Sequence, residues 1–279
     1  TVQETTVPTG YAVTYNQANL TATNTHTPAT LSKTVSKVWA DNNNQDGLRT
    51  DVTFKLVATA DGAEVDWQTL KNASASGAQM DQDGLVTLAG RKDESYTFES
   101  LPEKYLGKAV VYTVLETTVP DAYQESYDQT TLTVTNSYTP RTTSKTVSKV
   151  WVDNNNQDDL RTDVTLQLVA TANGQEVPWE TLKNASLSGE NMDLDGLVTL
   201  TGKTDESHLF ENLPEKYQGK TVAYTVKEPT VPTGYAVTYD QATLTATNPH
   251  TPATLSKTVS KVWADNNDQD GLRTEITLK

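Results

Sequence analysis

The stretch SKTVSKVWADNNNQDGLR, residues 32–49, decides the fold. Val35, Lys37 and Trp39 share one parity, and this alternation is typical of a half-buried β-strand. The polar run that follows is rich in Asn, Asp and Gly, the residues that favour turns. Alternation then resumes at residues 52–56. A strand, a turn and a second strand therefore predict an antiparallel β structure.

The same string recurs along the chain and shows a repeat. SKTVSKVW begins at Ser32, Ser144 and Ser256, so the period is 112 residues. Internal periodicity of this kind indicates tandem structural units. Thr-Pro pairs precede each copy, and a Pro in a polar, Thr-rich neighbourhood is a boundary signal. We expect the end of one repeat at 1–29, complete repeats at 30–140 and 142–252, and the start of another repeat at 254–279.

Further alternation within one repeat predicts about seven short strands, which favours an antiparallel β-sandwich. The segment from Trp67 to Met80 lacks alternation, and the sequence leaves open whether it is a short helical turn or a loop. Beyond the first two strands, we expect strands near 85–88, 96–98, 109–116, 123–127 and 131–138.

Composition excludes several classes of function. The 279 residues carry a net charge of -14, which disfavours nucleic acid as a partner. There is no Cys and there are three His, so disulfides, thiolate catalysis and metal sites built from these residues are not expected. No apolar run of about 18 residues is present, so we expect no membrane insertion in this segment. We also expect a segment without targeting signals.

Three polar residues per repeat interrupt apolar faces. Lys37 follows the parity of Trp39, Glu116 follows Tyr112 and Val114, and Asn136 extends the apolar face of its own strand. A buried charge needs a partner or a change of protonation state. One interpretation is a buried Lys–Glu ion pair with a bonded Asn, or a Lys that reaches solvent at an edge. The other is an isopeptide bond, in which a neutral Lys amine attacks the Asn carbonyl while a protonated Glu moves protons.

Three strings in fixed order carry a family resemblance. KVWADNNNQDGLR at residues 37–49 is followed by YTVLE at 112–116 and by TNSYTP at 135–140, and equivalents recur one period later. This combination resembles the Cna B-type domain of Gram-positive surface adhesins. The resemblance implies tandem inverse immunoglobulin-like β-sandwiches, a stalk role and a Lys–Asn isopeptide bond between the first and last strands. It also implies a cell-wall-attached, extracellular location.

The resemblance assigns site residues by position. It implies that Glu116 and Glu228 are the proton shuttles, and that the bonds join Lys37 to Asn136 and Lys149 to Asn248. The partial repeats contain equivalents without a full set of partners, namely Glu4, Asn24 and Lys261.

Two departures from the family pattern stand out. The repeat is longer than many members of the family, with the excess between Trp67 and Gly90, and Asp159 replaces the Gly found at Gly47. Lys33 shares the parity of Lys37 but lies outside the KVW string, and we rank it below Lys37 as the nucleophile.

Two weaker signals have plainer explanations. DNNNQDG at Asp41 resembles a calcium loop, but the Gly and the bidentate Glu of an EF-hand are missing, so we favour a turn. The five Trp are expected in cores rather than on a sugar-binding platform, with Trp67 and Trp179 the pair to check for exposure.

The sequence therefore predicts a structural stalk or spacer of a bacterial surface adhesin. The alternative is an adhesive module that binds a host matrix protein or glycan directly through the Trp67 to Gly90 segment. An enzyme is not expected, because the proposed chemistry turns over once. We expect no cofactor, a monomeric chain, neighbouring repeats as its contacts and a host ligand bound by another domain.

Overall fold

The computed structural model describes residues 1–279, and its first complete repeat is a β-sandwich. The predicted strands are present, and the alternation of residues 30–40 becomes β3 with Val35, Lys37 and Trp39 buried. The repeat holds more strands than expected because two short ones, β5 and β8, carry no alternation that a sequence could show. The elements are β3 (Thr30–Ala40), β4 (Val52–Ala60), β5 (Ala63–Val65), α1 (Trp67–Ala73), β6 (Leu85–Leu88), β7 (Glu94–Pro102), β8 (Lys104–Tyr105), β9 (Lys108–Glu116), β10 (Gln124–Asp128) and β11 (Thr133–Ser137).

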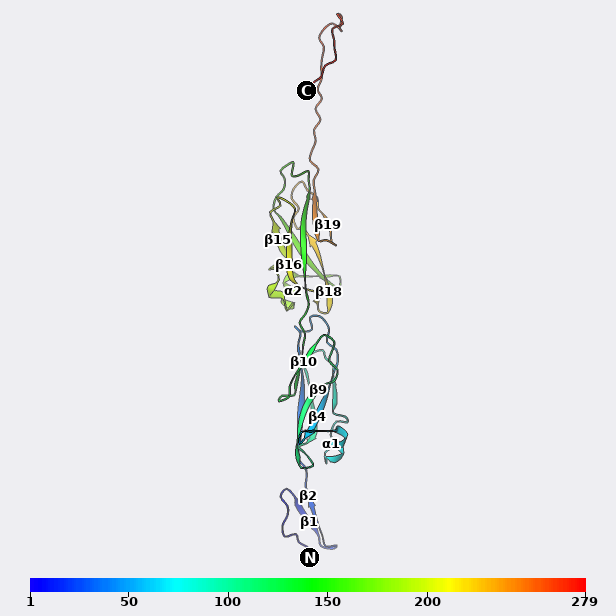
Figure 1. The fold of residues 1–279 in the computed structure, drawn as a ribbon, viewed down its shortest axis with the longest axis vertical. Coiled ribbons are helices and arrows are strands. Elements are labelled where there is room, and N and C mark those ends of the chain that lie inside the picture. The colour runs from blue at the N-terminus through cyan, green and yellow to red at the C-terminus, as the bar shows by residue number, and fades with distance from the viewer. The chain divides into compact units, whose positions relative to one another are not determined.

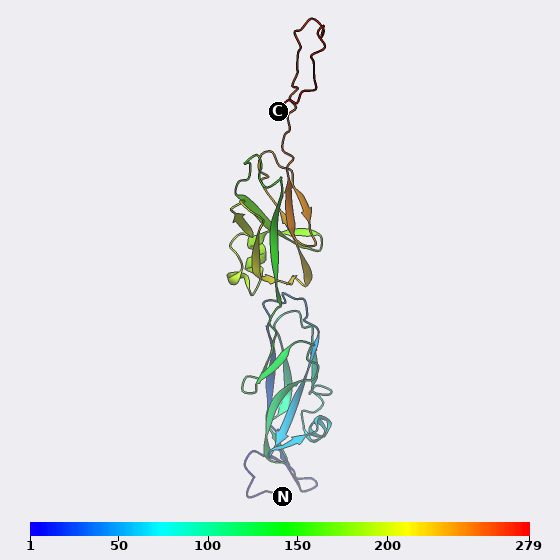
Figure 2. The same cartoon turned by 45° about the horizontal axis from the view of Figure 1, so that its top comes forward.

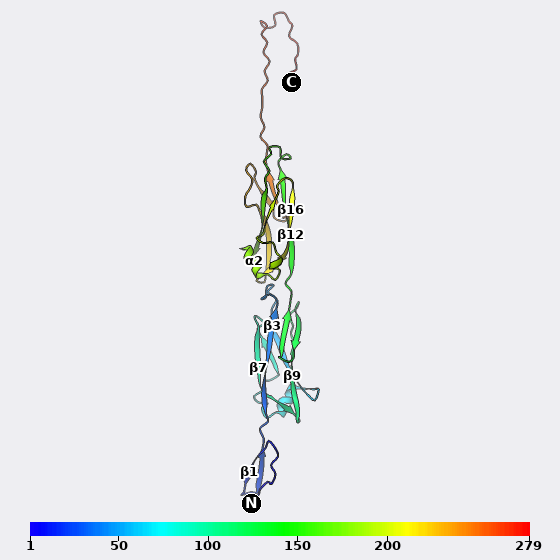
Figure 3. The same ribbon diagram turned by 90° about the vertical axis from the view of Figure 1, so that its left-hand side faces the viewer.

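Two sheets form the sandwich. One has the order β10-β11-β3-β7, and the other has the order β5-β4-β9-β8 with β6 also paired to β4. Figure 3 shows β3 beside β7 in the first sheet, where their pairing is antiparallel. The first long strand and the last strand, β3 and β11, are parallel neighbours, so the two ends of the repeat meet inside one sheet.

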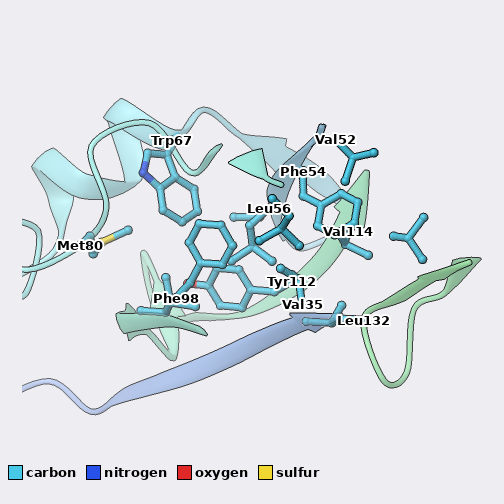
Figure 4. Close-up of a cluster of buried hydrophobic side chains, with 14 of the residues drawn as sticks. Val35, Val52, Phe54, Leu56, Trp67, Met80, Phe98, Tyr112, Val114 and Leu132 are labelled. Carbon is cyan, nitrogen blue, oxygen red and sulfur yellow. The ribbon is translucent and has the colours of Figure 1, made fainter. Parts of the chain in front are cut away.

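The core lies between the two sheets. Figure 4 shows Phe54, Leu56, Tyr112 and Val114 of one sheet gathered with Phe98 and other side chains of the facing sheet. Phe54 and Phe98 have no exposed surface. Burial of large apolar side chains stabilises the fold by roughly 1.5–3 kcal/mol each. A polar side chain on this face is therefore surrounded by hydrocarbon.

The segment after β5 contains a short helix, which settles the open alternative. Helix α1 begins after Asp66, whose carboxylate accepts a hydrogen bond from the Thr69 backbone N–H at 2.9 Å. Such an N-cap satisfies one of the free amides of the first turn. Trp67 and Leu70 are buried on the inner side of the helix. The extra segment thus contributes to the core of the first repeat.

The polar loop between β3 and β4 is a turn, as expected. Asn42, Asn43 and Asn44 all have positive φ, between 53° and 61°. Asn tolerates this left-handed conformation better than most residues, which explains the run of three. The Asn44 backbone N–H donates to the Asp41 carboxylate at 3.0 Å and closes the turn. A Cβ atom at Gly90 would lie 1.7 Å from the Thr50 carbonyl oxygen, so only glycine fits at position 90 beside this loop.

The second complete repeat has the same plan (Figure 2). Its sheets have the orders β16-β12-β20-β19 and β14-β13-β18-β17, with β15 paired to β13, and β12 and β20 are again parallel. The elements are β12 (Thr142–Val152), β13 (Val164–Ala172), β14 (Gln175–Val177), α2 (Trp179–Ala185), η1 (Gly189–Asn191), β15 (Leu197–Leu200), β16 (Glu206–Pro214), β17 (Lys216–Tyr217), β18 (Lys220–Lys227), β19 (Thr238–Asp240) and β20 (Thr245–Pro249).

The segments outside the two sandwiches, 1–29 and 253–279, contain no buried residue. Figure 1 shows the first as a hairpin of β1 (Ala12–Asn16) and β2 (Thr21–Thr25), and β2 is exposed along its whole length. Residues 253–264 form no strand. Trp263 is 39% exposed, so the expectation that all five Trp lie in cores is wrong for this residue. Residue 263 lies in no strand and no sheet covers its indole, over which the Lys261 Nζ lies at 4.2 Å from the ring centre.

Helices α1 and α2 contain seven residues each, and no helix of the chain is long and apolar enough to cross a membrane.

Candidate functional site

Lys37, Glu116 and Asn136 meet inside the first sandwich. Lys37 comes from β3 and Asn136 from β11 in one sheet, while Glu116 ends β9 in the facing sheet. Their exposed fractions are 1%, 5% and 0%. The parity argument therefore predicted all three inward positions correctly, and the interpretation in which Lys37 reaches solvent is wrong.

The Glu116 carboxyl group lies between the other two side chains. Its Oε2 is 3.6 Å from the Lys37 Nζ, and its Oε1 accepts a hydrogen bond from the Asn136 Nδ2 at 2.8 Å. The Lys37 Nζ also donates to the Val38 carbonyl at 3.2 Å and lies 4.2 Å from the centre of the Trp39 ring. One carboxyl group is thus in reach of both an amine and a carboxamide.

Burial shifts both ionisable groups toward their neutral forms. Desolvation lowers the pKa of Lys37 to about 8, although the nearby Glu116 carboxylate acts in the opposite direction. Desolvation also raises the pKa of Glu116, against the hydrogen bond from Asn136 and the charge of Lys37. A neutral amine is a nucleophile and a neutral carboxyl group can give a proton, so the shifts favour the protonation states that acyl transfer to nitrogen would need.

The second repeat has the same triad. Lys149, Glu228 and Asn248 are exposed by 1%, 5% and 0%. Asn248 Nδ2 donates to Glu228 Oε1 at 2.9 Å, and the Lys149 Nζ lies 3.4 Å from the centre of the Trp151 ring. Burial lowers the pKa of Lys149 to about 8 and raises that of Glu228. The arrangement is therefore a property of the repeat.

A second buried polar cluster lies at the end of β3, the strand that carries Lys37, and the sequence alone did not indicate it. Arg49 donates from Nε and Nη2 to the two oxygens of Asp41 at 2.7 and 2.5 Å. Tyr123 donates to the same carboxylate at 2.6 Å. Burial acts to raise the pKa of Asp41, but the bonds from Arg49 and Tyr123 outweigh it and lower the pKa. Both oxygens of Asp41 thus accept hydrogen bonds from the protein, and this carboxylate anchors the turn.

Asp93 holds the end of β3. One of its carboxylate oxygens accepts the Trp39 backbone N–H at 2.9 Å, and Asp205 does the same for Trp151 at 2.8 Å. Both acids are 54 residues away from the Trp that they hold. No local pattern could have indicated the contact.

Side chains of the β10–β11 hairpin position Glu116. The Glu116 backbone N–H donates to the Tyr127 hydroxyl at 3.3 Å. Gln129 accepts from the Val114 N–H at 2.8 Å and donates to the Val114 carbonyl at 2.9 Å, so that its carboxamide takes the place of a missing strand neighbour. These bonds fix the strand that carries Glu116 beside the strand that carries Asn136.

The segments 1–29 and 253–279 do not assemble a triad. Asn24 Nδ2 donates to Glu4 Oε1 at 3.0 Å, as in the complete repeats, but both residues are near or at the surface. Lys261 is exposed and donates to the Val262 carbonyl at 3.0 Å. The half-buried Lys33 of β3 lies in the same strand as Lys37 without a contact to Glu116. Lys37 is thus the Lys of β3 whose amine faces Glu116, at 3.6 Å.

The Trp67 to Gly90 segment places its aromatic residue inward in the first repeat. Trp67 is 7% exposed, and its Nε1 donates to the Asp81 carbonyl at 2.9 Å. Trp179, its equivalent, is half-buried. The structure contains no group of three or more His, Asp or Glu side chains arranged to hold a metal ion.

This fold and this buried triad define a tandem β-sandwich protein whose first and last strands lie side by side around a Lys–Glu–Asn group. The chain matches the Cna protein B-type domain twice, over residues 33–137 and 145–249. It therefore belongs to the family of Cna protein B-type domains.

Two similar proteins come from Staphylococcus aureus. A collagen adhesin is 36% identical over 264 residues, which are 93% of this chain and 19% of that protein. The chain thus spans about a fifth of its curated relative. The chain also resembles the crystal structure of two B repeat units of the collagen binding protein, with 33% sequence identity and a TM-score of 0.57. The match covers 96% of this chain and 61% of the chain in the crystal structure.

Proposed function

We propose that this chain is part of the stalk of a surface adhesin, on the outside of a Gram-positive bacterium, and that each complete repeat is closed by an autocatalytic isopeptide bond. The bonds join Lys37 to Asn136 and Lys149 to Asn248. We place the repeats at 30–140 and 142–252. Membership of the Cna B-type family and the similarity to a collagen adhesin support the stalk role.

The observation that carries the proposal is the position of the Glu116 carboxyl group, 3.6 Å from the Lys37 Nζ and 2.8 Å from the Asn136 Nδ2. Neutral Lys37 attacks the Asn136 Cγ, and a C–N bond forms. Glu116 accepts a proton from the attacking nitrogen and delivers a proton to Nδ2. The bond from Cγ to Nδ2 then breaks, and ammonia leaves. The reaction needs no further reactant, because the chain supplies amine, carboxamide and proton carrier.

The position of the bond suits a load-bearing spacer. Lys37 lies in the first long strand of the repeat and Asn136 in the last, and the two strands are neighbours. When the two ends of the repeat are pulled, a covalent link between these strands bears the force, and the residues between Lys37 and Asn136 do not. A chain without Cys has no disulfide to do this. Repeats of constant length, with a period of 112 residues and no insertion or deletion, also suit a part whose role is to set length.

Intact mass tests the proposal. We expect the purified chain to be lighter than its sequence mass by two molecules of ammonia. Lys37→Met and Lys149→Met are each expected to restore one ammonia, and the double variant to restore both. Lys33→Met is the matched control and should retain both bonds. A wild-type mass equal to the sequence mass rules the bonds out.

Direct binding of a host ligand by these repeats finds no support in the first repeat. The aromatic residue of the extra segment, Trp67, packs into the core at 7% exposure. We therefore assign ligand binding to another domain of the whole protein. A two-repeat fragment that bound collagen or another matrix protein would contradict this assignment.

A further inference from the structure

Each triad and the Trp beside it include polar atoms that are buried without a hydrogen-bond partner. In the first repeat these atoms are the Trp39 Nε1, the Asn136 Oδ1 and the Glu116 Oε2. The second repeat leaves the same three unpaired, on Trp151, Asn248 and Glu228. Buried polar groups are nearly always paired, because an unpaired one costs about 1–3 kcal/mol. In the first repeat the Glu116 Oε2 faces the Lys37 Nζ at 3.6 Å, which leaves one donor, the indole N–H, and one carbonyl acceptor without a partner. Because the indole N–H and the carbonyl oxygen are unpaired in both repeats, they call for a common explanation.

The indole lies beside the reacting groups. Trp39 and Asn136 are direct register partners on the parallel strands β3 and β11, which places their backbones about 4.8 Å apart. Both side chains are buried on the inner face, at 7% and 0% exposure. The Lys37 Nζ is 4.2 Å from the centre of the Trp39 ring. Trp151 and Asn248 are register partners in the same way.

We propose that the indole N–H of Trp39, and of Trp151 in the second repeat, donates a hydrogen bond to the Asn carboxamide oxygen during bond formation and to the carbonyl oxygen of the finished isopeptide. This inference rests on the proposed isopeptide chemistry. It gives Trp39 a catalytic role, beyond the core-packing role that its position in the sequence indicates.

A hydrogen-bond donor at this oxygen accelerates the reaction. When the Lys37 nitrogen adds to the Asn136 Cγ, the electron pair of the carbonyl bond moves to Oδ1, which becomes an oxyanion. The pair returns when the bond to Nδ2 breaks and ammonia leaves. Glu116 is engaged with the nitrogen of the carboxamide, through the 2.8 Å bond from Nδ2. A preorganised donor at the oxyanion in a water-free site is worth a factor of about 10²–10³ in rate.

The first experiment measures the rate of bond formation in each repeat of one chain. The chain is made by cell-free translation, sampled into acidic denaturant, digested and quantified as linked and unlinked peptides by mass spectrometry. In Trp39→Phe, which retains a ring but lacks the N–H, we expect the Lys37–Asn136 bond to form about 10²–10³-fold more slowly. The Lys149–Asn248 bond in the same molecule should form at the wild-type rate and serves as the internal control. Trp67→Phe, whose indole donates to Asp81, should leave both rates unchanged.

The second experiment does not depend on a variant that folds. In the linked wild-type protein, the indole N–H signals of Trp39 and Trp151 should be protected from hydrogen exchange, and a crystal structure should place each Nε1 within about 3.2 Å of its isopeptide oxygen. An indole N–H that bonds a water molecule, or one that exchanges like that of Trp263, overturns the inference.

The outcomes separate the two proposals. If neither repeat of the wild-type protein forms a bond, the isopeptide proposal itself fails. If both bonds form in the wild type, and the Lys37–Asn136 bond of the Trp39→Phe variant forms as fast as its Lys149–Asn248 bond, only the proposed role of the indole fails.

Discussion

The Asn136 Nδ2 donates to the Glu116 Oε1 at 2.8 Å, and this hydrogen bond crosses from one sheet of the sandwich to the other. It aligns the carboxamide of the last strand with a carboxyl group whose pKa is raised by burial. The same carboxyl group faces Lys37 through its second oxygen. Glu116 thus contacts both of the strands to be joined from the opposite sheet. We expect its replacement to affect both bond formation and the stability of the first repeat.

Glu116→Gln should block the bond in the first repeat and lower its stability. Cross-linking residues about 100 positions apart removes chain entropy from the unfolded state, by about 4–5 kcal/mol in the loop-closure treatment. We expect the melting temperature of the first repeat to fall on the order of 20 °C, measured by calorimetry, with intact mass reporting the missing bond.

The exposed Glu99 provides the control for that loss. Glu99→Gln should retain both bonds and the wild-type melting temperature. An unlinked Glu116→Gln protein that melted with the wild type would show that the bond contributes nothing to stability.

Blocking the bond should also introduce a pH dependence. In a Glu116→Gln, Glu228→Gln chain, Lys37 and Lys149 remain free amines, and burial in the fold lowers their pKa, to about 8 in the intact triads. In the unfolded chain the value is about 10.4. Between these limits the unfolded state binds more protons, so stability should rise with pH by up to about 1.4 kcal/mol per pH unit for each Lys. Denaturant unfolding from pH 7 to 10 measures the rise.

The linked wild-type protein should lack this rise, because an amide nitrogen does not titrate in this range. The difference between the two proteins is the informative quantity, since all other groups are common to both. Equal slopes would mean that the Lys amines are not buried as described.

Arg49→Met should destabilise the first repeat. Asp41 is 2% exposed, and Arg49 supplies two of its hydrogen bonds. Removing one partner of a buried pair leaves an uncompensated charge and costs about 3–5 kcal/mol. Chemical denaturation measures the loss, with the exposed Arg91→Met as the control. Restoration of stability by a further Asp41→Asn substitution is expected, because it removes the unpaired charge.

The three copies of SKTVSKVW provide a test with the sequence held constant. Amides of residues 32–39 and 144–151 lie in β3 and β12, whereas residues 256–263 are in no strand. We expect the amides that β3 and β12 use in sheet pairing to be protected in hydrogen exchange, and those of the third copy to exchange as in an unstructured peptide. Protection of the third copy at the level of β3 would refute the repeat boundaries proposed above.

Much of the site followed from parity alone. The inward positions of Lys37, Glu116 and Asn136 were predicted because each continues an apolar alternation within its own strand. The contacts that support them were not predictable in this way. Asp93 reaches Trp39 across 54 residues, and Gln129 completes the hydrogen bonding of Val114 from a neighbouring hairpin. Such contacts depend on which strands pair and in which register, and a local sequence pattern does not predict this.

The third copy of the repeat separates local from tertiary control. Its turn forms without a sandwich around it: Asn266, Asn267 and Asp268 have positive φ, and Arg273 bonds Asp265 as Arg49 bonds Asp41. These features depend on residues at most eight positions apart, so the sequence by itself determines them.

The strand is different. Residues 256–264 have the same sequence as residues 32–40, yet only the earlier copy is a strand. In the complete repeat, β11 and β7 pair with it on both sides and the facing sheet covers Trp39. A single strand cannot satisfy its own backbone hydrogen bonds or bury its own apolar face. Tertiary structure therefore decides that the segment is a strand, that Lys37 is desolvated and that it meets Glu116.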